Sequence, residues 1–407
     1  MSENRLDGYQ WRLLAFLSVA TFFEGFDFMA LSQVLPEIRE ELGLSIDTAG
    51  FMIPTINIGT VFAFLLIRKA DSWGRRRVLT ITIAGYTIFT GLTALSQGLW
   101  DFMLFQMIAR TFLIAEWATA MVFAAEEFPA QKRGLVMGLT QGFASLGSVA
   151  CAGVAPLLLS TDLGWRMVYL VGVVPLVLVA FSRRSLKETK RFAQQDAKRP
   201  AGLMTLLSGP YRGRVLLMGL LWALTYLGMS NAITFWKDFV VNQRGYTDGQ
   251  VGMALTIAAV VSMPMVFASG KLLDVAGRRM GAAVIYVGGM LGVAGAFTLT
   301  DPTWLNISLI FAIFGISGVL PVLNAYSTEL FPTDVRGDAF GWANNILGRI
   351  GYVLAPALVG VSAAGIGLGN AIAVSMIFPL IALIIILTTL PETTGRELEE
   401  TSSLKPG

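Results

Sequence analysis

Histidine is absent from this 407-residue chain, cysteine occurs once, and charged residues make up only 14% of the composition. Without histidine, the chain lacks a common zinc ligand and the side chain that most often carries protons near neutral pH. The single Cys151 cannot form an internal disulfide, and it lies in an apolar run, so we interpret it as a small packed side chain. Any proton transfer must therefore use carboxylates.

The shortage of charge also indicates a membrane protein. Soluble domains carry about 25% charged residues, whereas this chain is 55% hydrophobic with a mean hydropathy of +0.66. Its apolar segments approach the roughly 20 residues that a helix needs to cross the hydrocarbon. The polar first ten residues do not resemble a cleavable signal peptide, so we expect the first segment to remain as a helix. We predict an all-α membrane protein with twelve transmembrane helices, at 11–36, 48–67, 78–98, 102–125, 134–159, 165–182, 215–241, 250–270, 280–299, 304–328, 338–361 and 367–390.

The longest polar segment, residues 183–214, lies between the sixth and seventh of these segments. It is rich in basic residues, proline and glycine, which is typical of a solvated linker. We therefore expect an N-terminal six-helix half at 1–183, a linker at 184–214, a C-terminal six-helix half at 215–391 and a tail at 392–407.

Lysine and arginine placement predicts the orientation. Of the 30 basic residues, we place 24 on the side that holds both termini and four on the opposite side, while Arg110 and Arg349 fall within apolar segments. Loops with the positive excess face the cytoplasm. We therefore expect an inner-membrane protein with both termini cytoplasmic. The basic pI of about 9.0 then reflects topology, and we expect no nucleic-acid partner.

Two loop motifs occur twice. The sequence D-x-x-G-R-R at 71–76 recurs at 274–279, and E-x-x-P-x-x-x-R-G at 126–134 recurs at 329–337. Every matched pair differs by 203 positions, about half the chain. Two motifs in the same order at one offset indicate a duplication, so the two six-helix bundles should be pseudo-symmetric and oriented alike.

Together these motifs resemble those of the major facilitator superfamily, and 270–279 matches the longer G-x-x-x-D-x-x-G-R-R signature. The ending at 391–396 is similar to that of sugar porters. The resemblance implies a cytoplasmic latch that holds the halves together in the outward-facing state; the alternative is that these loops only anchor at lipid headgroups. The first copy departs from the pattern, with Ile67 at the glycine position followed by Arg68 and Lys69. The expected latch residues are Asp71, Gly74, Arg75, Glu126, Glu127, Arg133, Asp274, Gly277, Arg278, Glu329 and Arg336.

Charges inside the membrane are costly, so they usually line a cavity. Glu24 and Asp27 lie three residues apart on one face of the first helix. This stretch is similar to the D-G-x-D signature of aromatic-acid/proton symporters, with Glu24 replacing the first acid. Two close carboxylates in a low dielectric do not both ionise readily, which suits a proton carrier. We expect proton coupling at Asp27 or Glu24; the alternative is structural pairing with Arg110 or Arg349.

Arg349 resembles the helix-11 arginine of organic-ion and nicotinate-like transporters, and Asn345 precedes it by one turn. A guanidinium can bind a carboxylate through two parallel hydrogen bonds. We expect Arg349 to anchor the substrate; the alternative is a structural ion pair. Arg110 stands where related families have glycine, and Glu116 matches their G-x-x-x-G-G-E-W run, so both are further candidates.

The seventh segment adds three candidates for substrate contact, Trp222, Tyr226 and Asn231. Aromatic residues at this spacing more often pack against neighbouring helices, and that alternative stays open. Trp236 and Lys237, near the outer surface, are expected in the interfacial belt.

We therefore predict a transporter and not an enzyme: proton-coupled uptake of a small organic anion, such as an aromatic or other carboxylic acid, by alternating access. The alternatives are a proton-coupled exporter of organic cations or drugs, and a sugar or polyol transporter. No nucleotide-binding loop of the form G-x-x-x-x-G-K-[ST] occurs, which argues against an ATP-driven pump. We expect a monomer in the lipid bilayer with no metal and no cofactor, driven by the proton gradient.

Overall fold

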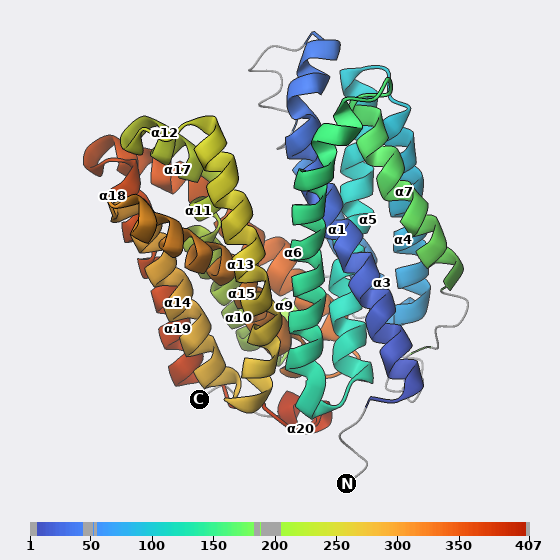
Figure 1. Cartoon of the computed structure of the whole chain (residues 1–407). Helices are drawn as coiled ribbons and strands as arrows, with labels where there is room; N and C mark the ends of the chain where they lie inside the picture. Colours follow the sequence, from blue (N-terminus) through green and yellow to red (C-terminus); the bar gives the residue numbers. More distant parts are fainter. Residues whose placement is uncertain (1–5, 44–51, 53–54, 183–187, 189–204, 404–407) are drawn as a thin grey trace. The chain divides into compact units, whose positions relative to one another are not determined.

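The computed structural model describes residues 6–43, 52, 55–182, 188 and 205–403. These residues form helices and connecting turns, with no strand among them (Figure 1). The chain divides into two compact units. Unit 1 comprises 1–128, 143–201 and 333–341, and unit 2 comprises 129–142, 202–332 and 342–407. Short segments of each sequence half therefore belong to the unit formed mainly by the other half.

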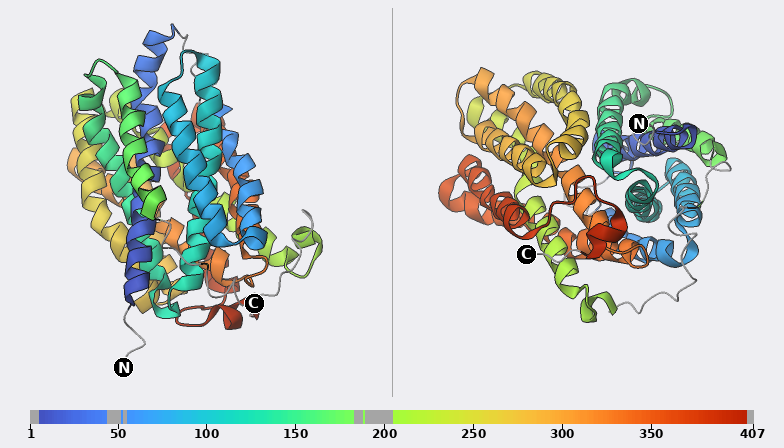
Figure 2. Two further views of the ribbon diagram at one scale, coloured as in Figure 1. Left: turned by 90° about the vertical axis from the view of Figure 1, so that its right-hand side faces the viewer. Right: turned by 90° about the horizontal axis from the view of Figure 1, so that it is seen from below.

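Unit 1 is built from long helices near the N-terminus together with one short helix from far along the chain. Its helices are α1 (Gly8–Glu41), α3 (Gly59–Trp73), α4 (Arg75–Ala94), α5 (Leu99–Glu127), the later part of α6 (Arg133–Leu159), α7 (Trp165–Ser182) and α16 (Arg336–Phe340). The view along the helices in Figure 2 shows several of them nearly end-on, as in a bundle.

Unit 2 is also built from helices, and several consecutive ones are separated by a single residue. Its elements are η1 (Ala130–Lys132), α9 (Thr205–Ser208), α10 (Arg212–Met229), α11 (Asn231–Thr234), α12 (Trp236–Arg244), α13 (Asp248–Val275), α14 (Arg278–Thr298), α15 (Pro302–Glu329), η3 (Gly341–Gly348), α17 (Arg349–Ile366), α18 (Leu368–Ser375), α19 (Ile377–Thr389) and α20 (Leu398–Ser403). The α16, η3 and α17 segments follow one another without a break, and the middle one is a π-helix.

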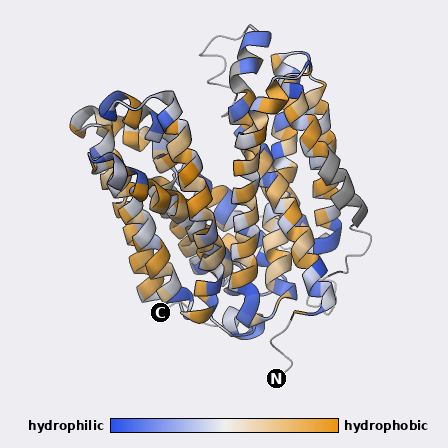
Figure 3. Ribbon diagram, viewed as in Figure 1, coloured by the Kyte–Doolittle hydropathy of each residue, from blue (hydrophilic) through white to orange (hydrophobic). Residues whose placement is uncertain are grey.

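Ten of the described helical segments are long and apolar enough to cross a membrane. Helices suit the hydrocarbon because every backbone polar group is satisfied within the segment. Apolar side chains such as Leu157, Leu291 and Val361 are exposed on their outer surfaces, as lipid-facing residues are. Figure 3 shows the same pattern, with hydrophobic residues along the helices and hydrophilic ones gathered near their ends. The expected span 48–67 lies partly outside the described residues, and 165–182 corresponds to α7.

Close approach of α1 and α6 in unit 1 depends on two glycines. A methyl group on Gly25 would lie 1.8 Å from the Ala144 carbonyl oxygen, and one on Gly147 would lie 1.8 Å from that of Phe22. Small residues allow such contact between membrane helices. Ser148 adds a hydrogen bond, donating from Oγ to the Gly25 carbonyl at 2.8 Å. The part of α1 that carries the predicted proton-coupling carboxylates is thus fixed tightly against α6.

Candidate functional site

In unit 1, the first D-x-x-G-R-R loop binds the start of α16. The Asp71 carboxylate accepts hydrogen bonds from the backbone N–H groups of Gly337 at 3.1 Å and Asp338 at 2.8 Å. It also lies 3.1 Å from Arg75 Nη2. A carboxylate at a helix N-terminus satisfies free N–H groups and is favoured by the helix dipole. Asp71 therefore connects α3 to the start of α16.

A second carboxylate in unit 1 is shared by two arginines. Glu126 Oε1 lies 3.0 Å from Arg75 Nη2 and 2.6 Å from Arg336 Nη1. All three side chains are almost completely buried. Charges can be buried only when they are paired and hydrogen-bonded. The structure thus brings together Asp71, Arg75, Glu126 and Arg336, four of the predicted latch residues.

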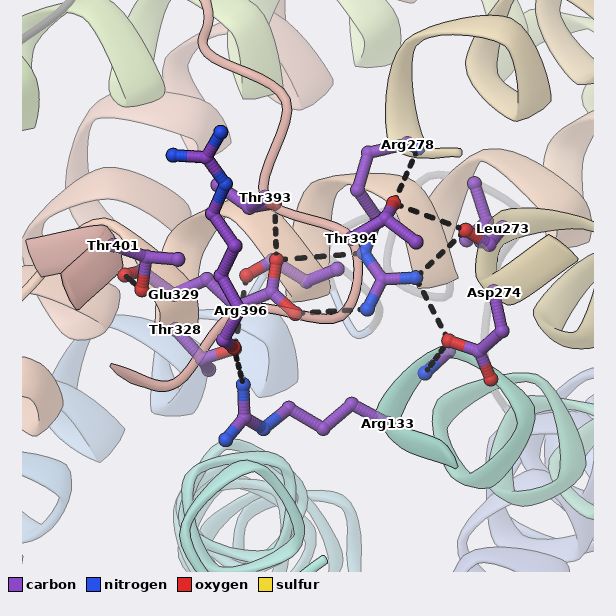
Figure 4. A network of polar contacts seen from close by, with 12 residues as sticks. Arg133, Leu273, Asp274, Arg278, Thr328, Glu329, Thr393, Thr394, Arg396 and Thr401 are labelled. Atoms are coloured by element: carbon purple, nitrogen blue, oxygen red, sulfur yellow. Dashed lines mark hydrogen bonds and ion pairs between the residues drawn. The ribbon is translucent and has the colours of Figure 1, made fainter. Parts of the chain in front are cut away.

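Unit 2 repeats this arrangement with the second copies of the motifs (Figure 4). Asp274 accepts hydrogen bonds from the backbone N–H groups of Gly134 at 2.9 Å and Leu135 at 2.7 Å. Arg278 lies 2.8 Å from Asp274 and 2.9 Å from Glu329. The corresponding glycines have nearly equal backbone angles, with φ 91° at Gly74 and 93° at Gly277, a conformation that favours glycine.

The two arrangements differ at the arginine that follows the proline. Arg336 contacts the Glu126 carboxylate, whereas Arg133 donates from Nη1 to the Arg396 carbonyl at 3.0 Å and lies 3.6 Å from Glu397. Figure 4 shows Arg133 directed at the C-terminal segment. Glu127 accepts a hydrogen bond at its carbonyl from Gln10 at 3.0 Å. The latch function of all these residues remains a prediction.

Two carboxylates that sequence reasoning missed bind the backbone of the D-x-x-G-R-R loops. Glu392 accepts hydrogen bonds from the backbone N–H groups of Arg278 at 2.8 Å and Arg279 at 3.1 Å, so it caps α14. Glu188 caps α4 in the same way, at 2.9 Å from Arg75 N and 3.2 Å from Arg76 N. Their spacing of 204 residues is close to the repeat offset, and this was the available signal.

The environment of Glu392 has opposing effects on its protonation. Burial alone would raise its pKa, but hydrogen bonds from the Thr394 hydroxyl and from backbone N–H groups of Arg279 and Arg278 favour the ionised form. The net effect holds the pKa of Glu392 below its usual value. The C-terminal segment is therefore attached through a carboxylate that is ionised at neutral pH.

The interior of unit 1 contains a second polar cluster around Asp27. Asp27, Tyr86, Arg110, Glu116 and Tyr169 are all less than a tenth exposed. Asp27 interacts electrostatically with Arg110 and with the Tyr86 hydroxyl, and Tyr86 also interacts with Glu116. Asp27 and Arg110 are thus brought together, as the alternative of structural pairing expected, while Glu24 lies one turn earlier on α1 and is half-buried. Nothing in the sequence singled out Tyr86 or Tyr169.

In unit 2, the guanidinium of Arg349 lies against two tyrosine rings. Its guanidinium carbon lies 5.7 Å from the ring centre of Tyr226 and 5.3 Å from that of Tyr352. The two tyrosine rings meet edge to face at 5.6 Å, and the Trp222 ring lies 5.5 Å from Tyr226. Trp222 is held in place by its Nε1, which donates to Ser327 Oγ at 2.9 Å. Of these residues, sequence reasoning missed Tyr352.

Asn345 and Asn231 have different surroundings. Asn345 is fully buried within η3, one turn before Arg349. Asn231 donates from Nδ2 to the carbonyls of Leu227 at 3.1 Å and Ala355 at 3.3 Å, so it joins α11 to α17. The belt prediction is wrong for Trp236, which is fully buried, with its ring packed edge-on against Tyr246; Lys237 is exposed.

The apolar helices, the duplicated loops and the two buried polar clusters define a multi-pass membrane transporter. The chain belongs to the Major Facilitator Superfamily, whose family model matches residues 17–356. It is 28% identical to the cis,cis-muconate transport protein of Acinetobacter baylyi, over 90% of this chain and 92% of the relative. It is 27% identical to the gentisate transporter of Corynebacterium glutamicum, over 87% of this chain and 82% of the relative.

Among solved structures, the fold is similar to that of the proton:xylose symporter XylE bound to 6-bromo-6-deoxy-D-glucose. The TM-score is 0.83 at 17% identity, covering 98% of this chain and 99% of that one. The predicted fold class and the prediction of a transporter rather than an enzyme are confirmed by these matches.

Proposed function

We propose that the protein takes up a small organic anion, a carboxylic acid, by proton-coupled symport. The observation that carries this proposal is the placement of Arg349 against the paired rings of Tyr226 and Tyr352. A guanidinium there offers a carboxylate two parallel hydrogen bonds, and the rings offer faces to an unsaturated skeleton. The names of the muconate and gentisate transporters support the same substrate class.

Proton coupling would reside in unit 1. While Asp27 is ionised, it balances the charge of the neighbouring Arg110. Protonation of Asp27 removes that balance, so Asp27 compensates the positive charge of Arg110 only while it is ionised. One proton that moves together with a monovalent anion transfers no net charge, so the pH difference across the membrane drives uptake, at about tenfold accumulation for each pH unit. One proton-carrying carboxylate therefore couples uptake to the proton gradient, and the proposal requires no cofactor.

Alternating access would open and close the latch in each cycle. The carboxylates of Asp71 and Asp274 bind backbone N–H groups that lie far away in the sequence. Such contacts can break without unfolding either helix, because each is a single carboxylate on a helix end. We assign the latch to the cytoplasmic side, both termini to the cytoplasm, and the protein to the inner membrane as a monomer.

A thermal-shift screen of detergent-purified protein tests the substrate class. Small carboxylates, organic cations and sugars are compared on wild type, Arg349→Ala and Arg349→Lys. A ligand at 100 times its Kd adds about 2.7 kcal/mol of stability. We expect carboxylates to stabilise wild type, Arg349→Lys less, and Arg349→Ala not at all. Stabilisation by cations would instead favour a proton-coupled exporter, and stabilisation by sugars alone would favour a sugar transporter.

A further inference from the structure

A group of basic and aromatic side chains lies in unit 1 where α3 ends and α4 begins. Lys69 Nζ lies 5.2 Å from the ring centre of Trp73, and the guanidinium carbon of Arg77 lies 5.6 Å from it. These distances are typical of cation–π contacts. Lys69, Trp73 and Arg77 are exposed, as is Arg76 in the first turn of α4. These four residues, named here the Trp73 cluster, carry three positive charges at the surface.

The exposed face of α3 leads to this cluster. Phe62, Leu65, Lys69 and Trp73 follow one another at spacings of three and four residues, so they lie along one side of the helix. The side chains of Phe62 and Leu65 are 48% and 54% exposed, and that of Trp73 is 44% exposed. Tryptophan and basic residues are typical of the level of the lipid headgroups. One side of α3 therefore combines an apolar surface suited to an acyl chain with positive charges suited to a headgroup.

The charges of the Trp73 cluster are not balanced by carboxylates of the described residues. Within that part of the chain, none of its three basic side chains forms an ion pair. Two carboxylates approach the same turns, but each binds a helix end: Asp71 binds the start of α16, and Glu188 binds the start of α4. Like charges that lie close together favour the binding of an anion.

The second copy of the loop lacks this cluster. Leu272, Ala276 and Met280 of unit 2 stand at the positions of its lysine, its tryptophan and its second arginine. Ala276 and Met280 are exposed, so the corresponding surface is neutral at these positions. The second loop nevertheless has the same capping contacts and nearly equal glycine backbone angles. The cluster is therefore not needed to form the loop, and its charges require another explanation.

We propose that the Trp73 cluster is a binding site for an anionic phospholipid. Its three basic side chains bind the phosphodiester, and its indole lies at the level of the headgroup. Phe62 and Leu65 contact an acyl chain. A phospholipid suits this surface better than a soluble anion does, because the apolar face is continuous with the charges. The site contains no residue assigned to substrate or proton binding, so the proposal stands apart from the proposed function.

Native mass spectrometry of the delipidated full-length protein in detergent tests this site with dioleoyl-phosphatidylglycerol and dioleoyl-phosphatidylcholine. A basic residue near the membrane surface contributes roughly fivefold to the affinity for an anionic lipid. We expect wild type to prefer phosphatidylglycerol by at least about tenfold. In the double variant Lys69→Gln with Arg77→Gln, its affinity should fall by more than about tenfold, with phosphatidylcholine binding little changed. Lys271→Gln with Arg212→Gln, which removes two exposed charges of unit 2, is the matched control.

Sodium phosphate distinguishes a lipid from a free anion. Compared with sodium chloride at equal ionic strength, it screens charge to the same extent. We therefore expect both salts to displace phosphatidylglycerol equally, because the acyl chain contributes to binding. Stronger displacement by phosphate would overturn the lipid assignment in favour of a soluble anion.

Two further outcomes would overturn the proposal. Equal affinity of wild type for the two lipids would do so, as would an equal loss of phosphatidylglycerol binding in the control double variant. If Lys69→Gln with Arg77→Gln does not fold, Arg77→Gln alone should still lower the affinity by about fivefold. An unchanged affinity in that single variant would exclude the cluster as the site.

Discussion

Arg68 Nε lies 3.1 Å from Asp338 Oδ1, an ion pair that joins α3 to α16 within unit 1. Its repeat-related positions in unit 2 hold Lys271 and Leu135, which cannot form such a pair. There the backbones are close instead, because Gly270 occupies the position of Ile67: a methyl group on Gly270 would lie 2.1 Å from the Gly134 carbonyl oxygen. Corresponding helix contacts in the two repeats thus depend on charge in one case and on close packing in the other.

Removing the Arg68 pair should loosen α16. With Ala339→Cys in α16 as reporter in a Cys151→Ser background, we expect Arg68→Gln or Asp338→Asn to raise the maleimide labelling rate roughly two- to fivefold, since partly exposed pairs contribute modestly. The exchange of charges, Arg68→Asp with Asp338→Arg, should restore slow labelling. Lys271→Ala is the control. Equal labelling in all variants would show that the pair has no role in holding α16.

The close packing of α6 and α13 predicts that Gly270→Ala is destabilising. The added methyl group overlaps the Gly134 carbonyl, and overpacking typically costs about 1–3 kcal/mol. Gly252→Ala in the same helix meets no atom within 4 Å and should be neutral or slightly stabilising. Thermal unfolding in detergent compares the two. A Gly270→Ala protein as stable as Gly252→Ala would contradict the packing.

Glu126 balances two buried arginines, so Glu126→Gln should be strongly destabilising. Breaking a buried ion pair by removing one partner costs about 3–5 kcal/mol, because a charge is left uncompensated. Glu400→Gln, which removes an exposed pair with Arg396, should change stability by less than about 1 kcal/mol. Chemical denaturation of both variants gives the comparison, and similar losses in the two would refute the buried network.

Attachment of the C-terminal segment should weaken in acid. The pKa of Glu392 is lowered in the folded protein, so its contribution is complete above the unfolded pKa of 4.5 and is lost as the pH falls through the folded value. Wild type should therefore exceed Glu392→Gln in stability at pH 7, and the difference should shrink below about pH 4.5. Unfolding midpoints across this range measure it. A difference independent of pH would mean that the carboxylate charge is not what holds the segment.

Asp27→Asn should abolish accumulation while leaving exchange. A fixed neutral side chain cannot carry a proton, so uptake into energised vesicles should fall to the level of equilibration, whereas counterflow of substrate should persist. Glu24→Gln is the comparison: if it alone loses accumulation, the proton site is Glu24. Tyr86→Phe, which removes the hydroxyl near Asp27, should shift the pH dependence of uptake without abolishing it.

Much of this molecule follows from its sequence. The 203-residue repeat predicted two similar loop arrangements, and Asp71 and Asp274 make corresponding contacts in the structure. Motif residues are predictable because their roles depend on local spacing at helix ends. The caps Glu188 and Glu392 were missed because their spacing differs by one residue from the repeat offset, and because their contacts form only where the chain returns to the helix ends.

Other features depend on contacts that a single sequence does not encode locally. Trp236 is of the residue type expected at a membrane interface, yet it is buried. Its ring contacts Tyr246, which follows the end of α12. The winding of η3 has no apolar periodicity of its own to reveal it, so the sequence predicted an uninterrupted helix at 338–361. The expected boundaries of the halves remain predictions, and most of the linker lies outside the described residues.

The π-helix also has an evolutionary consequence. A π-turn is one residue longer than the α-turn it replaces, so deleting a single codon within 341–348 would change which side chains of this segment face the same way as Arg349. Flanking contacts on both sides could be kept. The gain or loss of one residue in this segment therefore alters which side chains lie beside Arg349, although the gene still encodes every one of them.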